Sequence, residues 1–155
     1  MATSRDHTRL GRALRDAQLL SLSTAHVMLH LVRRSSSIVR LGVEDPRMSK
    51  IVIHRGTVYT CGQTAADAGD CVTKQTEACL AKVDALLQQA GTDKSHALNA
   101  MIWLKNIDRD FKSMNGVWNA WVDPDNKPTR ATVEGAMARP SILVEIQVTA
   151  AMPES

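Results

Sequence analysis

The chain has 155 residues and a formal net charge of +3. This length predicts a single domain that is large enough to bury a real core. Residues 1–41 contain seven Arg, no Lys and two Asp, which gives +5, whereas the remainder has 12 basic and 14 acidic residues. The basic character therefore belongs to the N-terminal segment, and the composition of the globular part argues against nucleic acid as a partner.

Aromatic residues and cysteines are both scarce. The aromatic residues are Tyr59, Trp103, Phe111, Trp118 and Trp121. Because unpaired bases usually stack on aromatic side chains, their scarcity also weighs against binding of single-stranded nucleic acid. The cysteines are Cys61, Cys71 and Cys79. They form no Cys-x-x-Cys pair and no Cys/His metal spacing, so we expect no metal, and such a sparse, odd set favours a reducing compartment.

Residues 1–41 differ from the rest of the chain. They are rich in Arg, Ser and Thr and poor in acids, and residues 10–25 carry part of a helical apolar stripe. This composition is typical of an organelle transit peptide, but a structural extension fits it as well. The apolar stretch of residues 19–32 is too short and too polar to span a membrane. We expect a cytoplasmic protein, or a mitochondrial one if this segment is a transit peptide.

The globular part, residues 42–155, begins with a predicted hairpin and a helix. Residues 49–54 and 57–62 are rich in β-branched residues and are separated by Arg55-Gly56, which predicts two strands joined by a turn. Apolar residues at spacings of three and four predict a helix over residues 71–90, with Asp70 as N-cap and Gly91 as the terminating residue.

The second half repeats the alternation of strands and helices. Residues 97–107 are predicted to form a strand, and Asp108 is predicted to cap a helix that continues to residue 122. Strands over residues 129–137 and 141–149 follow, because both are rich in β-branched residues and the second alternates strictly. The order β-β-α-β-α-β-β predicts an α+β domain with two helices on one face of a mixed sheet. The other face then needs a partner, which argues for an oligomer.

Two charged residues stand on the last two predicted strands. Arg130 opens the first of them and Glu145 lies in the middle of the second. A cation and a carboxylate flanked by apolar residues are candidates for a polar pocket. A surface ion pair across the sheet explains them as well, and such pairs contribute little to stability.

Four patches resemble one known family. They are Val58 to Gln63 (VYTCGQ), Gln75-Thr76 through Ala90-Gly91, Phe111 to Trp121 (FKSMNGVWNAW), and Pro128-Thr129-Arg130 with Val144-Glu145-Ile146. In this order they resemble the RidA (YjgF-like) family of reactive-imine deaminases. The resemblance implies a chorismate-mutase-like fold and a homotrimer with clefts between subunits. It also implies substrates of the 2-aminoacrylate type, enamines and imines that are hydrolysed to keto acid and ammonia without a cofactor.

The resemblance implies a role for each matching residue. Arg130 binds the substrate carboxylate through its planar fork, and Glu145 holds or activates water. Asn115 orients substrate or caps a strand, and Gly62 lets the backbone approach the ligand or forms a bulge. Cys61 contacts the ligand or is a small buried residue.

The sequence also departs from the family. Cys61 stands where Ser is common, Thr132 stands in the substrate site where many members have Cys, and no tyrosine precedes Tyr59, although active deaminases carry an early one. Three functions therefore stay open. The chain is an imine deaminase, a trimer that binds small carboxylates without turnover or acts as a chaperone, or an endoribonuclease or translation inhibitor.

Overall fold

The computed structural model describes residues 37–154. Its strands are β1 (Val39–Leu41), β2 (Ile51–His54), β3 (Thr57–Thr60), β4 (Gln63–Thr64), β5 (Ala97–Leu104), β6 (Thr129–Glu134) and β7 (Val144–Ala151). The helices are α2 (Val72–Ala90) and α3 (Ile107–Trp121), with 3-10 turns η1 (Ala66–Ala68) and η2 (Lys94–His96).

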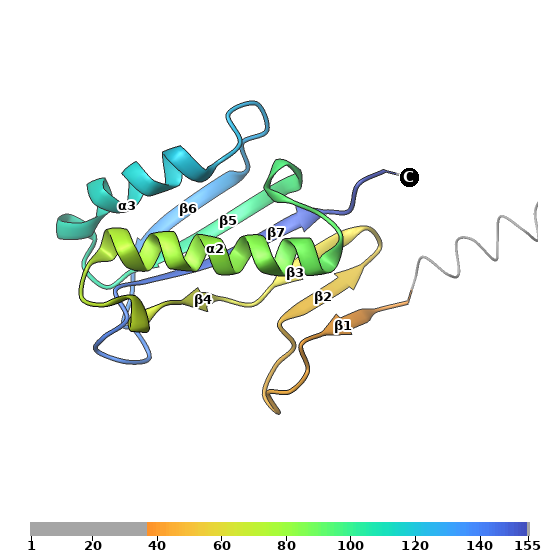
Figure 1. Ribbon diagram of the computed structural model, residues 1–155, viewed down its shortest axis with the longest axis horizontal. Helices are drawn as coiled ribbons and strands as arrows, with labels where there is room; N and C mark the ends of the chain where they lie inside the picture. Colours follow the sequence, from red (N-terminus) through yellow and green to blue (C-terminus); the bar gives the residue numbers. More distant parts are fainter. Residues whose placement is uncertain (1–36, 155) are drawn as a thin grey trace, which may run out of the picture. The chain divides into compact units, whose positions relative to one another are not determined.

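The strands form one mixed sheet in the order β1-β2-β3-β7-β5-β6, and β4 adds a short pairing to β7. Neighbouring strands are antiparallel except β5 and β6, which are parallel because α3 crosses between them. Both helices lie on the same face of this sheet (Figure 1). The predicted α+β architecture is confirmed.

The core lies between the helices and one face of the sheet. In β7 every second residue is buried, beginning with Val144, and the residues between them, beginning with Glu145, are only half buried. This alternation follows from the period of two in a strand. It gives the sheet a helix face, which packs on α2 and α3, and an open face, which the two helices do not cover.

Helix α2 buries the predicted apolar stripe against the sheet. Gly91 ends it with φ of 84°, a left-handed conformation that glycine adopts without strain, as expected. The predicted N-cap is wrong. Cys71, not Asp70, takes the extended N-cap conformation, and no side chain caps this end.

Helix α3 also begins differently from the prediction. Asn106, two residues before Asp108, is the N-cap, and its side chain accepts a hydrogen bond of 2.9 Å from the Arg109 amide. Both residue types cap helices well, so composition alone did not choose between them. Ile107, the first residue of α3, donates its amide hydrogen to the Glu134 carboxylate at the end of β6. Ile107 amide.

The strands are generally shorter than predicted, and one was missed. β5 ends at Leu104 and β6 ends at Glu134, whereas we expected residues 107 and 137. The missed strand is β1, which pairs antiparallel with β2. It falls inside the segment assigned to the basic leader, so the sheet begins before residue 42. The remainder of that leader, residues 1–36, lies outside the described part of the chain, and so does its assignment as transit peptide or extension.

Gln75 joins α2 to the segment that enters β7. This side chain is fully buried, and its Nε2 donates to the carbonyls of Gly69 and Ser141 at 2.7 and 2.8 Å. Its Oε1 accepts from the Leu143 amide at 2.9 Å. Since a buried amide must satisfy its hydrogen bonds, this network fixes the chain just before Glu145.

Neither helix of the described chain is long and apolar enough to cross a membrane.

Candidate functional site

Arg130 lies on the helix face of the edge strand β6. It pairs with Ala100 of β5, which is fully buried in the core, so both side chains point to the helices. One Arg130 nitrogen, Nη1, donates to Asn115 Oδ1 at 2.7 Å. The guanidinium carbon lies 5.2 Å from the centroid of the Trp118 ring, a cation–π distance. Burial lowers the pKa of Arg130, but a guanidinium this basic stays a cation at neutral pH.

Thr132 lies two residues further along the same strand and on the same face. Its pairing partner is Ile102, another fully buried residue of β5. The Thr132 hydroxyl oxygen is buried and has no hydrogen-bond partner within residues 37–154. Buried hydroxyls usually find a partner, so this atom is an unfilled polar position close to Arg130.

Glu145 lies on the open face of β7. Its neighbours Val144 and Ile146 are fully buried on the helix face, so Glu145 points the opposite way. It pairs with Trp103 of β5 and with Thr64 of β4. Within residues 37–154, its carboxylate makes neither a hydrogen bond nor an ion pair. It is therefore free to bind water or a ligand.

Gly62 and Cys61 lie on the Glu145 side. A methyl group on Gly62 would collide with Glu145 Oε1 and lie 2.9 Å from its carboxyl carbon. Glycine at this position therefore gives the carboxylate its place, rather than only making room for a ligand. The half-buried Cys61 thiol is 3.0 Å from the side-chain nitrogen of Gln63.

Arg130 and Glu145 lie too far apart within one chain to share a ligand directly. Strand β5 separates their strands, and the β5 residues opposite them are three apart. Two strand spacings of about 4.8 Å and three residues of about 3.3 Å each therefore lie between their Cα atoms. They also point to opposite faces, and no ion pair joins them in the described chain. The interpretation as a surface ion pair is thus wrong for a single subunit.

The structure accordingly contains two half-sites. The cation half-site comprises Arg130, Asn115, Thr132 and Trp118 on the helix face. The carboxylate half-site comprises Glu145, Gly62 and Cys61 near the open face. Trp118 is the residue that sequence reasoning assigned only to the core. The available signal was its spacing of three from Asn115, which puts both side chains on one side of α3.

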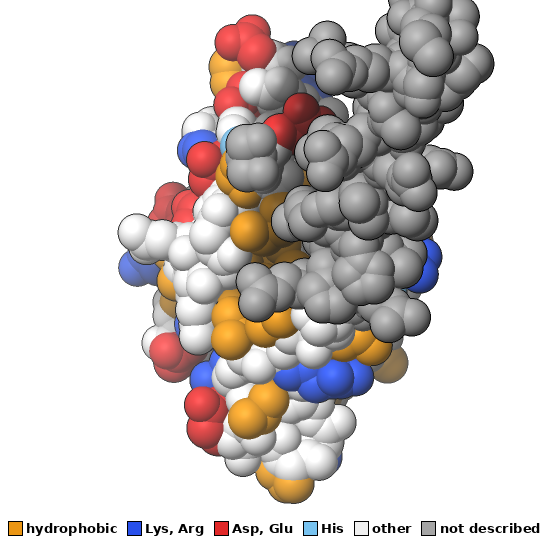
Figure 2. Space-filling view, turned by 90° about the vertical axis from the view of Figure 1, so that its right-hand side faces the viewer, with side chains coloured by type: hydrophobic (Ala, Val, Ile, Leu, Met, Phe, Trp, Pro, Cys, Tyr) orange, Lys and Arg blue, Asp and Glu red, His pale blue; other side chains and the backbone are white. Residues whose placement is uncertain are grey.

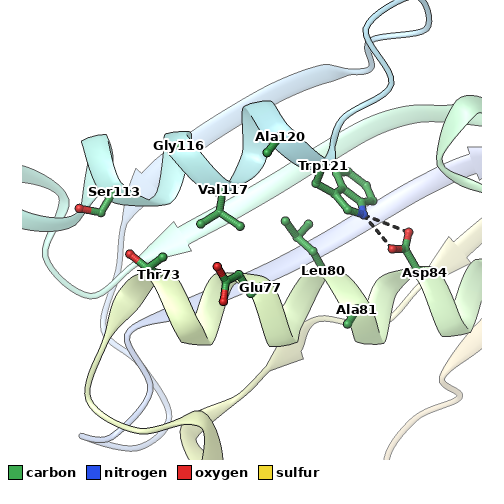
Figure 3. Close-up of a pocket in the computed structure, with 10 residues that line it drawn as sticks. All are labelled: Thr73, Glu77, Leu80, Ala81, Asp84, Ser113, Gly116, Val117, Ala120 and Trp121. Atoms are coloured by element: carbon green, nitrogen blue, oxygen red, sulfur yellow. Dashed lines mark hydrogen bonds between the residues drawn. The ribbon is translucent and has the colours of Figure 1, made fainter.

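Two hollows occur in the described part, and neither is lined by Arg130 or Glu145. A groove of about 490 Å³ runs between α2 and α3 and ends at Trp121 and Asp84 (Figure 3). A second hollow of about 750 Å³ lies beside Lys105 and Arg139, next to the loop before β7. A site made from two subunits has no complete cavity in one chain, so we base the site on the side-chain chemistry. No group of three potential metal ligands occurs among the described residues.

Comparisons with known proteins fit this geometry. The family model for Endoribonuclease L-PSP matches residues 44–152. The chain belongs to that family. The RutC family protein YoaB of Escherichia coli is 40% identical over 119 residues, which cover 75% of this chain and 99% of YoaB. A RutC family protein of Haemophilus ducreyi is 38% identical over 115 residues, covering 74% of this chain and 97% of that protein.

Solved structures of the family have the same fold. The crystal structure of a YjgF family member from Neisseria meningitidis superposes with a TM-score of 0.74 at 37% identity, covering 78% of this chain and 99% of that one. The expected YjgF-like membership and chorismate-mutase-like fold are confirmed. The printed names of these relatives specify neither a substrate nor an assembly.

Proposed function

We propose that this chain hydrolyses reactive enamine and imine acids of the 2-aminoacrylate type, in clefts formed between the subunits of a homotrimer. One observation carries the proposal. A guanidinium with uncommitted N–H groups and a carboxylate with no partner lie on opposite faces of one sheet. A symmetric oligomer can bring the helix face of one β6 edge to the open face of a neighbour, so that two half-sites make each cleft.

The two half-sites suit the two ends of such a substrate. The planar fork of Arg130 matches a carboxylate, while Asn115 holds the opposite side of the guanidinium. Fixing the carboxylate also places the neighbouring C=N carbon, which lowers the entropic part of the barrier. Glu145 of the adjoining subunit then faces the reacting carbon with a water molecule.

The reaction follows from these roles. Glu145 takes a proton from water, and the oxygen attacks the imine carbon of the protonated imine, whose C=N π electrons move to nitrogen. Glu145 then passes that proton to the nitrogen of the carbinolamine. The C–N bond breaks, ammonia leaves, and loss of the hydroxyl proton gives the keto acid. The balance is one imine and one water consumed for one keto acid and one ammonia, so no cofactor is required.

Complementation between variants tests the shared cleft. Arg130→Ala and Glu145→Gln subunits are each expected to be inactive alone. After mixing, unfolding and reassembly, three-quarters of random trimers are mixed and each mixed trimer has one intact cleft of three, so activity should return to about a quarter of the parent value. No recovery, with mixed trimers verified by mass spectrometry of tagged subunits, would place both residues in one subunit's site. A stable monomer in sedimentation at micromolar concentration would also overturn the trimer.

The principal rival is a trimer that binds small 2-keto acids without turnover. The departures at Cys61 and Thr132 and the absent early tyrosine favour weak or narrow activity, so binding and turnover must be measured separately. Imines made in situ by an amino-acid oxidase give the turnover, read as semicarbazide-competed keto acid and released ammonia. Pyruvate binding through Arg130 with no hydrolysis of any such imine would establish the binding protein.

Endoribonuclease activity, which the family name suggests, has less support in this chain. Cleavage of RNA needs a surface that attracts phosphates. On the side shown in Figure 2, the basic side chains that are described lie among acidic and hydrophobic ones. Cleavage of RNA that stops in Arg130→Ala would nevertheless favour this function over imine hydrolysis.

A further inference from the structure

The Arg130 guanidinium is held at two points, both of them on α3. Asn115 accepts one of its N–H groups at 2.7 Å, and the Trp118 ring lies under the guanidinium, 5.2 Å from its central carbon. The other N–H groups make no hydrogen bond within residues 37–154. This arrangement fixes the plane of the fork and leaves donors for a carboxylate.

The Trp118 ring is itself fixed by its surroundings. It is 5% exposed and lies at 51° to the Trp121 ring, with 5.1 Å between centroids. The Trp121 indole N–H donates to both carboxylate oxygens of Asp84 on α2, each at 3.0 Å (Figure 3). A chain of contacts therefore runs from α2 through two indoles to the guanidinium.

We propose that Trp118 is the positioning residue for Arg130, and that the Trp121–Asp84 contact holds Trp118 in place. The inference rests on the proposed function, because it assumes that Arg130 receives the substrate carboxylate. A long Arg side chain on an exposed edge strand otherwise samples many rotamers. An aromatic face that already holds the guanidinium removes that loss of freedom from the binding step. Trp118 touches Arg130 rather than the substrate, so it acts through Arg130.

Pyruvate, a 2-keto acid with the required carboxylate, is a probe that does not depend on turnover. Calorimetric titration of full-length Trp118→Leu should give a dissociation constant about 5- to 30-fold above the parent, the effect of losing a partly desolvated cation–π contact. Trp118→Phe keeps an aromatic face and should stay within about threefold. Trp121→Phe is the matched control, because its ring keeps the packing on Trp118 but loses the bond to Asp84, and we expect at most about a twofold change.

A double-mutant comparison separates positioning from simple packing. If Trp118 acts only through Arg130, adding Trp118→Leu to Arg130→Ala should lower the residual imine hydrolysis by less than about twofold. The pH profile of Trp118→Leu turnover should match that of the parent, because Glu145 is untouched. Failure of Trp118→Leu to fold leaves the test to Trp118→Phe against Trp118→Met, where only the first should bind pyruvate nearly as the parent does.

Three results would overturn the inference while leaving the proposed function intact. They are parent-like pyruvate binding by Trp118→Leu or Trp118→Met, an equal loss in Trp118→Phe, or an undiminished effect of Trp118→Leu in the Arg130→Ala background. Failure of the proposed function looks different. In that case, the parent protein neither binds pyruvate through Arg130 nor hydrolyses an imine, and the inference fails with it.

Discussion

The cation half-site and the carboxylate half-site differ in how their side chains are held. Arg130 is fixed by side chains, a hydrogen bond from Asn115 and the ring of Trp118, all on one helix. Glu145 has no such partner in the described chain, and its place is set by backbone, through the glycine beside it. The binding group is thus preorganised, whereas the group that must gain and lose a proton keeps its freedom. This difference suits a site in which one residue orients and the other reacts.

The largest expected effect comes from removing the preorganised cation. Arg130→Ala should lower kcat/KM for every imine by about two to four orders of magnitude, the equivalent of two charge-assisted hydrogen bonds of about 1.5–3 kcal/mol each. Arg130→Lys should fail to restore it, because a point charge cannot form the bidentate fork. Steady-state kinetics on imines generated in situ measures this. Equal hydrolysis by Arg130→Ala and the parent would show that the assignment of the cleft is wrong.

The other half-site should give a loss of a different kind. Glu145→Gln keeps the size of the side chain and a hydrogen-bonding group but removes the base. Turnover should therefore fall by about two to four orders of magnitude, while pyruvate binding stays near the parent value. Calorimetry and single-turnover kinetics on the same preparation test both parts. A variant that loses binding and turnover together would remove the contrast between the half-sites.

A smaller effect tests whether backbone places the carboxylate. The added methyl of Gly62→Ala would meet the end of the Glu145 side chain, which can swing away without unfolding the sheet. Turnover should drop about ten- to a hundredfold, as expected for a reacting group displaced by about 1 Å, with little change in melting temperature.

Gly116→Ala is the matched control, because nothing lies within 4 Å of the added methyl on this helical position. It should leave turnover unchanged and keep or slightly raise the melting temperature. Melting that falls as steeply as turnover in Gly62→Ala, but not in the control, would mean that the glycine serves the fold rather than Glu145.

The smallest effect is expected from the N-terminal segment. Both half-sites lie in the family-like part of the chain, so a protein that begins at Ser37 should fold, assemble and hydrolyse imines within about twofold of the full chain. This start point keeps β1, which a start at residue 42 would remove. Circular dichroism, sedimentation and kinetics give the answer. Failure of the shortened protein to fold, with the full chain folding well, would make residues 1–36 structural.

The sequence predicted the layers of the fold better than the arrangement of the site. Period-two and period-3.6 patterns located β7 and α2 because burial is what those patterns record. The helix N-termini were misplaced because Asp70 and Asn106 are local competitors whose choice depends on tertiary packing. β1 was missed because three residues carry too little periodicity to be recognised.

The faces of the two charged residues could not be read from the chain alone. Arg130 and Glu145 stand on consecutive predicted strands, which suggested a direct pair. Strand β5, which comes earlier in the chain, lies between those strands. Only the pairing order and register show that the two side chains diverge. The close approach of Gly62 to the carboxylate is likewise a product of tertiary structure.

The position of β7 has a consequence for synthesis on the ribosome. This last strand lies in the interior of the sheet, paired with β3, β4 and β5. Until residue 151 has left the exit tunnel, β1-β2-β3 and β5-β6 are separate ribbons, each with an open edge and an apolar face that only non-local contacts can bury. The nascent chain therefore cannot fold gradually as it emerges, and it stays exposed to misassociation until its final strand arrives. Carboxylate and sheet then form in one step, since the strand that completes the fold also carries Glu145.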